Sequence, residues 1–268
     1  MFQLKHPLAA TALGLMALST TASAVTLADL QKDGPYAIQS QAIPGSGFGS
    51  GTIHAPTQAG KYALVAVCPG FVSPESAITP ISKRLATHGF VVVTIATSTL
   101  FDFPGSRANQ ILAALQAASK VSTGNAAGKI DTSRMVASGW SMGGGGTLIA
   151  TAKTPTLKAA VAYAPWELSA TPFAKITVPT IIFGATGDAI APVSGHAQKF
   201  YDTIPGTTRK ALGVLQGDNH FFPTKADDPV SYNNIAWAKR FADGDTSYGL
   251  FLTGADAKWN KWSSTGPF

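Results

Sequence analysis

The 268-residue sequence predicts an α/β fold, in which helices cover both faces of a mainly parallel central sheet. From residue 60 onward, short apolar runs rich in β-branched residues alternate with stretches of helical pattern, as parallel strands joined by helices do. Hydrophobic residues make up 45% of the chain and charged residues only 13%, which favours a well-buried core. The chain has no repeat, charge block or linker, so we expect residues 25–268 to form one domain.

The apolar runs and the stretches between them give the order of the elements. Segments 37–42 and 47–54 are expected to form an antiparallel hairpin at the sheet edge. Only residues 164–179 separate two of the central strands, which leaves no room for a lid domain and predicts an open, shallow site. The predicted strands are Tyr62–Cys68, 89–95, 135–138, Ala159–Tyr163, 180–183 and Lys210–Leu215. The predicted helices are 76–88, 106–119, 142–152, 193–203 and 232–242.

Residues 1–24 have the pattern of a secretory signal peptide. Lys5 supplies the positive start, residues 7–18 the apolar stretch, and Ala22-Ser23-Ala24 the cleavage site. The apolar stretch is too short to cross a bilayer, and no other stretch qualifies. We therefore expect a secreted protein, extracellular or periplasmic, with no membrane span.

Composition argues against several classes of partner. The formal net charge is +6, but the basic residues are scattered singly, unlike the clusters of nucleic-acid binders. The single cysteine, Cys68, excludes an intramolecular disulfide and is expected to be a small buried hydrophobe. The histidines lack the spacing of a metal site, and the glycines at 143–146 lack a phosphate-binding pattern. We expect a monomer with neither metal nor cofactor.

The most informative stretch is Gly139-Trp140-Ser141-Met142-Gly143. It follows the predicted strand 135–138 and precedes a predicted helix, which is the context that Gly-x-Ser-x-Gly needs to be a nucleophile elbow. The turn is so tight that its flanking positions must be nearly free of side chains, which explains both glycines. The pattern therefore predicts that Ser141 is the nucleophile of an acyl-transfer enzyme.

A serine nucleophile needs a histidine base. In α/β-hydrolases the order along the chain is serine, then aspartate or glutamate, then histidine, so the base comes after Ser141. Two histidines come after Ser141, and His220 lies in a polar turn just after the apolar run 211–215. His196 falls inside the predicted helix 193–203 and is expected in the wall of the pocket instead. His220 is the predicted base.

The base in turn needs a carboxylate that fixes its tautomer. Asp188 lies on the loop directly after the predicted strand 180–183, from which it can reach the imidazole. The alternatives fit less well: Asp202 is on a helix surface, Asp218 is too close to the base in sequence, and Glu167 comes too soon after its strand. Asp188 is the predicted acid.

An oxyanion hole needs two backbone N–H donors. The residue after the nucleophile, Met142, supplies one donor in this fold. The other comes from the loop after an earlier strand, and Tyr62–Cys68 ends in Pro69-Gly70-Phe71. We expect the N–H groups of Phe71 and Met142 to form the hole.

With these residues in place, the chain resembles the bacterial cutinases and poly(ethylene terephthalate) (PET) hydrolases of the α/β-hydrolase fold. The similarity covers roughly residues 35–245 and implies that Ser141, Asp188 and His220 are catalytic. The matched stretches are Pro69-Gly70-Phe71, 88–92, 131–135, 139–146, Ala164-Pro165-Trp166 and 188–193.

The resemblance also implies an aromatic cleft. In it Trp166 would stack on the acyl ring of the substrate, flanked by Ile190, Met142 and Phe71. The alternative is that Trp166 is a core tryptophan at the end of its strand.

Other positions separate the two subtypes of the family. Members with a mobile stacking tryptophan carry small residues at the positions of His196 and Phe200, where this chain has bulky ones, so Trp166 is expected in one rotamer. Phe221 matches the cutinases, whereas Trp140 matches the PET hydrolases.

The chain also departs from the family pattern. Ala185 and Phe222 stand where the family has a disulfide near the active site, and the carboxyl-terminal disulfide is absent too. Residues 76–81 lack the usual aromatics of that helix, and Ala96 replaces an acidic residue. These changes bear on substrate range and thermal stability.

The sequence thus predicts a secreted serine carboxylester hydrolase that cleaves polyester or cutin-like esters, including aromatic polyesters such as PET. One alternative is a general short-chain esterase or lidless lipase with incidental polyester activity. A second is a catalytically silent binding protein on the same fold, which the intact triad and elbow disfavour.

Overall fold

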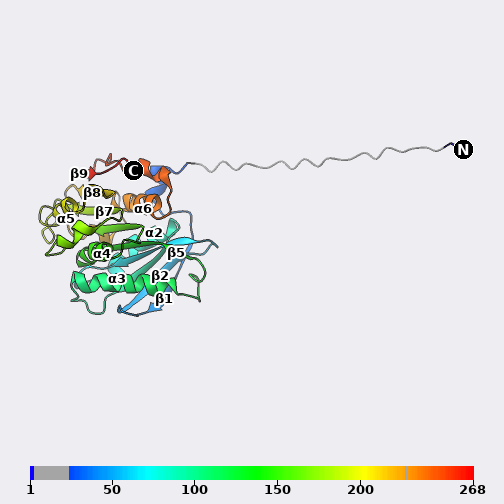
Figure 1. Ribbon diagram of the computed structural model, residues 1–268, viewed down its shortest axis with the longest axis horizontal. Helices are drawn as coiled ribbons and strands as arrows, with labels where there is room; N and C mark the ends of the chain where they lie inside the picture. The colour runs from blue at the N-terminus through cyan, green and yellow to red at the C-terminus, as the bar shows by residue number, and fades with distance from the viewer. Residues whose placement is uncertain (3–23, 227–228) are drawn as a thin grey trace.

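The computed structural model describes residues 1–2, 24–226 and 229–268 (Figure 1). The predicted signal peptide therefore lies outside the described residues, apart from residues 1, 2 and 24. Within the described part, nine strands form one sheet in the order β1-β2-β4-β3-β5-β6-β7-β8-β9. The strands are β1 (Ile38–Pro44), β2 (Ser50–Pro56), β3 (Tyr62–Cys68), β4 (Val91–Ala96), β5 (Ile130–Trp140), β6 (Ala159–Tyr163), β7 (Thr180–Ala185), β8 (Lys210–Leu215) and β9 (Trp259–Ser264).

The centre of the sheet is parallel and its two edges are antiparallel. Strands β4, β3, β5, β6, β7 and β8 pair in parallel, while β1 and β2 form an antiparallel hairpin that joins β4. Strand β9 pairs antiparallel with β8 at the other edge. This arrangement confirms the predicted α/β-hydrolase fold class and the edge hairpin.

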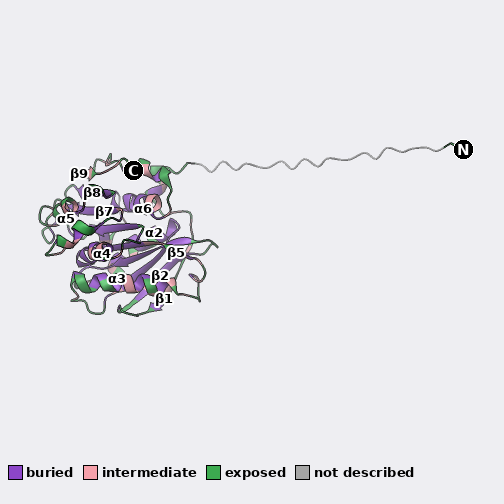
Figure 2. Cartoon of the chain, in the orientation of Figure 1, coloured by how far each residue is buried: buried purple, intermediate pink, exposed green. Residues whose placement is uncertain are grey.

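Helices cover both faces because alternate side chains of the central strands point to opposite sides. In β3, Val65 and Val67 pack in a core with α2 and α6, whereas Leu64 and Ala66 pack in a core with α3. A third core lies under α5 and η2. Figure 2 shows the central strands buried, and exposed residues lie on the edge strands β1 and β9, the outer helix surfaces and the loops. The helices are α1 (Leu27–Leu30), α2 (Thr79–Thr87), α3 (Pro104–Ser119), α4 (Met142–Lys153), α5 (Ala197–Thr203) and α6 (Val230–Phe241), with 3-10 turns η1 (Glu75–Ile78), η2 (Thr171–Lys175), η3 (Phe222–Thr224) and η4 (Thr246–Phe251).

Two predicted helices differ from the observed ones. The predicted helix 76–88 divides into η1 and α2, with a proline in the first turn of α2. The predicted helix 193–203 was wrong over its first residues, because Pro192–His196 forms a turn: the N–H groups of Gly195 and His196 both donate to the Pro192 carbonyl at 3.0 Å. His196 is the N-cap of α5, with non-helical φ and ψ of −127° and −89°, and not a residue within the helix.

Two elements were not predicted at all. Helix α1 is a single turn closed by a capping box between Thr26 and Asp29. Strand β9 reads Trp-Asn-Lys-Trp-Ser-Ser, too polar to be identified as a strand, and it is held by two tryptophans. The ring of Trp259 stacks on Phe183 at 5.9 Å and packs against Trp262 at 5.4 Å. No helix in the described part of the chain is long and apolar enough to cross a membrane.

Candidate active site

The predicted triad lies at the carboxyl ends of three parallel strands. Ser141 follows β5 directly, Asp188 lies on the loop after β7, and His220 lies on the loop after β8. The carboxyl ends of parallel strands meet at one edge of the sheet, which is where α/β proteins form their ligand sites. The fold therefore brings together three residues that are far apart in sequence.

Ser141 has the strained backbone of a nucleophile elbow. Its φ of 57° and ψ of −120° are rare for a residue with a side chain. The strain is held in place by neighbouring backbone: the Ser141 N–H donates to the Tyr163 carbonyl, and its carbonyl accepts from the Trp166 N–H, both at 2.9 Å. The elbow predicted from the sequence is therefore present in the structure.

The glycines beside Ser141 are required by close backbone approach. A Cβ on Gly139 would strike the Gly143 carbonyl, and one on Gly143 would strike the carbonyls of Cys68 and Pro69. The elbow thus packs against both its own helix and the end of β3. Any larger residue at these two positions would displace Ser141.

A continuous chain of hydrogen bonds links the three triad residues. His220 Nε2 lies 2.8 Å from Ser141 Oγ, and His220 Nδ1 lies 2.7 Å from Asp188 Oδ2. Because an ionised carboxylate can only accept, Nδ1 donates to Asp188 and Nε2 is left to accept from the serine hydroxyl. All three side chains are buried. This is the geometry in which a histidine can take the proton of an attacking serine.

The carboxylate of Asp188 is fixed from both sides. Its Oδ1 accepts from the N–H groups of Ile190 at 2.9 Å and Ala191 at 2.7 Å, while Oδ2 faces His220. Burial alone would raise the pKa of Asp188, but the hydrogen bonds from His220 and from these two N–H groups hold it below its usual value. Asp188 therefore stays ionised.

Trp140 lies beneath the base. It is buried, and its indole N–H donates to the His220 carbonyl at 2.9 Å. Its ring lies 5.6 Å from the imidazole and 5.7 Å from Phe221, between ring centroids. The sequence predicts a substrate contact for Trp140, and the structure adds a hydrogen bond that positions the loop carrying His220.

The loop after β3 brings the predicted oxyanion donors next to Ser141. A Cβ on Gly70 would lie 3.0 Å from the Ser141 Cβ, so the Gly70-Phe71 backbone runs directly past the nucleophile. Met142 is the first residue of α4, where N–H groups have no partner within the helix. In the described part of the chain, the N–H groups of Phe71 and Met142 donate to no protein group. Both are therefore available to a ligand.

Arg107 was not anticipated from the sequence and it organises this region. The side chain is fully buried on α3, and its guanidinium donates to the carbonyls of Pro69 at 3.1 Å, Leu100 at 3.0 Å and Asp102 at 2.6 Å. It thus holds the loop after β3, which carries the predicted oxyanion donor Phe71, and the loop before α3 together. The one signal in the sequence is a charged residue on the apolar face of a predicted helix, beside Ala108 and Ile111.

The predicted cleft residues divide into a packed group and an exposed group. Trp166 is half-buried and its ring stacks on His196 at 5.9 Å, while His196 meets the buried Phe200 edge-on at 5.6 Å. Burial lowers the pKa of His196, so this imidazole is neutral near neutral pH. Ile190 and Phe221 are 51% and 52% exposed, and the Phe221 ring meets Trp140 and His220 edge-on.

Cys68 offers no competing nucleophile. Burial raises the pKa of the Cys68 thiol to about 12, which keeps it from acting as a thiolate nucleophile. Among the residues that the structure describes, no group of three His, Cys, Asp or Glu side chains could hold a metal ion.

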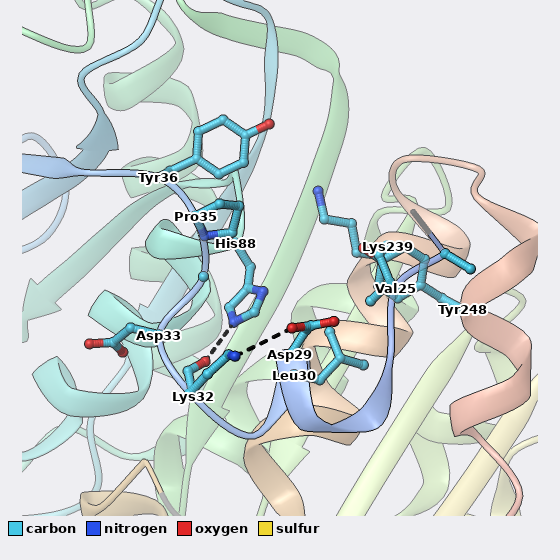
Figure 3. Close-up of a pocket in the computed structure, with 12 residues that line it drawn as sticks. Val25, Asp29, Leu30, Lys32, Asp33, Pro35, Tyr36, His88, Lys239 and Tyr248 are labelled. Atoms are coloured by element: carbon cyan, nitrogen blue, oxygen red, sulfur yellow. Dashed lines mark hydrogen bonds and ion pairs between the residues drawn. The ribbon is translucent and has the colours of Figure 1, made fainter. Parts of the chain in front are cut away.

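A separate pocket of about 530 Å³ lies between the N-terminal segment, α6 and η4 (Figure 3). Asp29 and Lys32 form an ion pair at 3.4 Å, and the Lys32 carbonyl is 3.0 Å from His88 Nε2. His88 precedes β4, so this pocket is at the amino ends of the parallel strands, opposite the triad. Its polar groups join the N-terminal segment to the body of the protein.

The sheet order and the strained serine define an α/β-hydrolase, and comparison with known proteins specifies the family. The sequence profile of a family described as PET hydrolase-like matches residues 20–265. The chain is 40% identical to cutinase est1 of Thermobifida alba over 88% of this chain and 82% of that protein. It is 40% identical to a cutinase of Thermobifida fusca, strain YX, over 88% of this chain and 80% of that protein. It is 41% identical to a bis(hydroxyethyl) terephthalate hydrolase of Streptomyces coelicolor over 82% of this chain and 71% of that protein.

The chain therefore belongs to the PET hydrolase-like family and is a carboxylester hydrolase. This confirms the family and the enzyme class predicted from the sequence motifs.

Proposed function

We propose that the protein is a secreted serine hydrolase of polyester or cutin-like esters, including aromatic polyesters such as PET. The observation that carries the proposal is the hydrogen-bonded chain from Ser141 through His220 to Asp188, built on a strained elbow. The kinship with cutinases and with a bis(hydroxyethyl) terephthalate hydrolase supports the substrate class.

The proposed reaction begins with acylation of Ser141. As Oγ attacks the ester carbonyl, its proton passes to Nε2 of His220, and Asp188 stabilises the resulting imidazolium. The carbonyl oxygen becomes an oxyanion and accepts from the N–H groups of Phe71 and Met142. Losing one such donor typically costs about 3–4 kcal/mol of transition-state stabilisation. His220 then protonates the departing alcohol, and the acyl-enzyme remains.

Water completes the cycle by the reverse sequence. His220 takes a proton from the water as it attacks the acyl carbonyl, and the same two N–H groups stabilise the second oxyanion. Collapse of this intermediate releases the carboxylic acid, and Ser141 regains its proton from His220. The reaction needs neither a metal nor a cofactor.

The cleft residues would select an acyl group with an aromatic ring. Trp166 supplies a flat face for it, and stacking between aromatic rings contributes about 0.5–1.5 kcal/mol beyond burial. Because His196 stacks on Trp166 and is itself packed against Phe200, the indole is held in one orientation. Met142, Phe71, Ile190, Trp140 and Phe221 line the rest of the proposed site.

The surroundings of the site fit a bulky substrate. The connection from β6 to β7, residues 164–179, is described in full and contains the single short turn η2. We therefore propose an open site without a lid, in a single catalytic domain of residues 25–268 that follows a signal peptide of residues 1–24. We further propose that it acts as a monomer.

The test is the release of soluble products from an amorphous aromatic polyester film by the mature protein. Turnover of p-nitrophenyl butyrate by the same preparation establishes competence, and Ser141→Ala is the blank. Release that disappears in Ser141→Ala supports the proposal. A preparation that turns over the small ester and leaves the film intact indicates a short-chain esterase. Residues 76–81, which lack the usual aromatic side chains, would then be the first positions to mutate.

A further inference from the structure

A group of exposed apolar side chains surrounds the oxyanion loop. Phe71 and Val72 follow β3, and Leu100, Phe101 and Phe103 lie on the loop between β4 and α3. Phe101 and Phe103 are 65% and 59% exposed, and the other three are also exposed. Soluble monomers rarely leave large apolar side chains gathered at the surface unless they bind something. We call these five residues the aromatic platform.

The platform is one continuous surface. The ring of Phe71 meets Phe101 edge-on at 5.8 Å and lies 6.4 Å from the ring of Phe103, between centroids. The backbone N–H of Val72 donates to the Leu100 carbonyl at 2.9 Å, which joins the two loops. Because Phe71 is also a predicted oxyanion donor, the platform begins at the site of ester cleavage and extends outward from it.

The loop that carries the platform is anchored from beneath. Arg107 holds the carbonyls of Leu100 and Asp102. Gln110, also on α3, accepts from the Ser98 N–H at 2.7 Å and donates to the Asp102 carboxylate at 2.9 Å. The exposed rings are therefore presented on a fixed backbone, so little conformational freedom is lost when a ligand binds.

The platform offers no exposed cation to a ligand. Asp102 is the one acidic residue between Leu100 and Phe103; it is partly exposed, and its Oδ2 accepts from the Thr99 N–H and from Gln110. Arg107 is buried. A surface of five exposed apolar side chains without an exposed cation fits an apolar, uncharged polymer, and its one carboxylate would repel an anionic headgroup or a phosphate backbone.

We propose that the aromatic platform is a docking surface for polyester chain outside the cleft, which holds the segment beyond the ester bound at Ser141. The inference rests on the proposed function, since that function supplies a polymer whose repeating rings reach past the site. A short soluble ester reaches Phe71 at most and does not extend to Phe101 or Phe103.

The variant that tests the platform is Phe101→Ser with Phe103→Ser. Leu250→Ser is the matched control, because Leu250 is 77% exposed on η4, the turn whose Tyr248 lines the pocket at the opposite end of the sheet. Adsorption to polyester film is measured in the Ser141→Ala background, so that binding is read without hydrolysis. Product release from film and turnover of p-nitrophenyl butyrate are measured with Ser141 intact.

We expect adsorption and product release by the double variant to fall at least about fivefold, because the binding energies of two ring contacts are lost together. Its turnover of p-nitrophenyl butyrate and that of Leu250→Ser should stay within about twofold of the parent. If the double variant does not fold, Phe101→Ser alone is used as the test, and its adsorption to film and product release should fall about threefold.

The outcomes separate this inference from the proposed function. Film release and adsorption that are equal in parent and double variant overturn the platform, while the polyesterase assignment stands. If the parent adsorbs to film through the platform but does not cleave it, the polyesterase assignment is overturned and polymer docking on the platform is supported. A dimer that dissociates in the double variant would make the platform an interface between two copies, and would overturn polymer docking.

Discussion

The role of Asp188 can be tested by an isosteric change, Asp188→Asn. The two ends of this carboxylate face different partners: Oδ1 accepts from the N–H groups of Ile190 and Ala191, and Oδ2 accepts from His220. The asparagine carbonyl must take the Oδ1 position, because an NH₂ group there would face two donors. The amide NH₂ then points at Nδ1 of His220.

This orientation forces the imidazole into the wrong tautomer. Nδ1 must become an acceptor for the asparagine NH₂, so the proton moves to Nε2, which can no longer accept from Ser141. The equivalent change in a serine protease triad lowers kcat about 10⁴-fold, and we expect a similar loss here. At about 1.36 kcal/mol per decade, this corresponds to about 5.4 kcal/mol.

The assay is kcat/KM for p-nitrophenyl butyrate, measured together with the thermal midpoint. Asp202→Asn is the control, since it removes a carboxylate from the exposed surface of α5 and should change activity by about twofold at most. The Asp188→Asn protein should stay folded, because the two backbone N–H groups keep their acceptor. A folded variant whose kcat/KM falls less than about tenfold would show that Asp188 does not set the tautomer of His220.

Three further predictions concern the elbow, the buried arginine and acid stability. Gly143→Ala should abolish turnover of p-nitrophenyl butyrate, because its Cβ would strike the carbonyls at the end of β3, whereas Gly105→Ala, with open space around it, should be active; equal activity would contradict the packing. Arg107→Met removes the guanidinium donors of three carbonyls, of which that of Leu100 keeps the Val72 N–H, and should lower the free energy of unfolding in urea by about 3 kcal/mol; a loss under about 1 kcal/mol would argue against a stabilising role for Arg107. Burial lowers the pKa of His54 to about 4, so between about pH 6.5 and 4 the unfolded chain binds a proton that the folded chain does not, and stability falls as the pH drops through that window. In the parent this lowers the free energy of unfolding by up to about 3 kcal/mol, and in His54→Gln the decrease, measured by urea unfolding across the pH range, should be smaller. An unchanged dependence of the free energy of unfolding on pH would contradict the prediction.

The central strands, and the placing of Ser141, Asp188 and His220 beside one another, could be predicted because each depends on local sequence. Strands buried on both faces appear as uninterrupted apolar runs, and Ser141, Asp188 and His220 each follow such a run. The carboxyl ends of parallel strands then place the three loops together. The elbow glycines were also predictable, since the tight turn excludes side chains whatever surrounds it.

The parts that were missed depend on contacts between distant segments. Strand β9 is polar and gains its stability from Trp259 on Phe183, a contact that its own sequence does not encode. The amino half of β5, residues 130–135, is only partly buried and lacks the apolar pattern of its carboxyl half. Arg107 on an apolar helix face becomes intelligible only when its acceptors on the loops before α3 are known.

The nucleophile is tested most directly by trapping it with a p-nitrophenyl phosphonate ester and locating the label by peptide mass spectrometry. We predict one label, on Ser141, that appears as activity is lost and is absent from Ser141→Ala. We also predict slow labelling of Asp188→Asn, since His220 would no longer take the serine proton. Labelling at another residue, or inactivation with Ser141 unmodified, would contradict the assignment of this serine as the nucleophile.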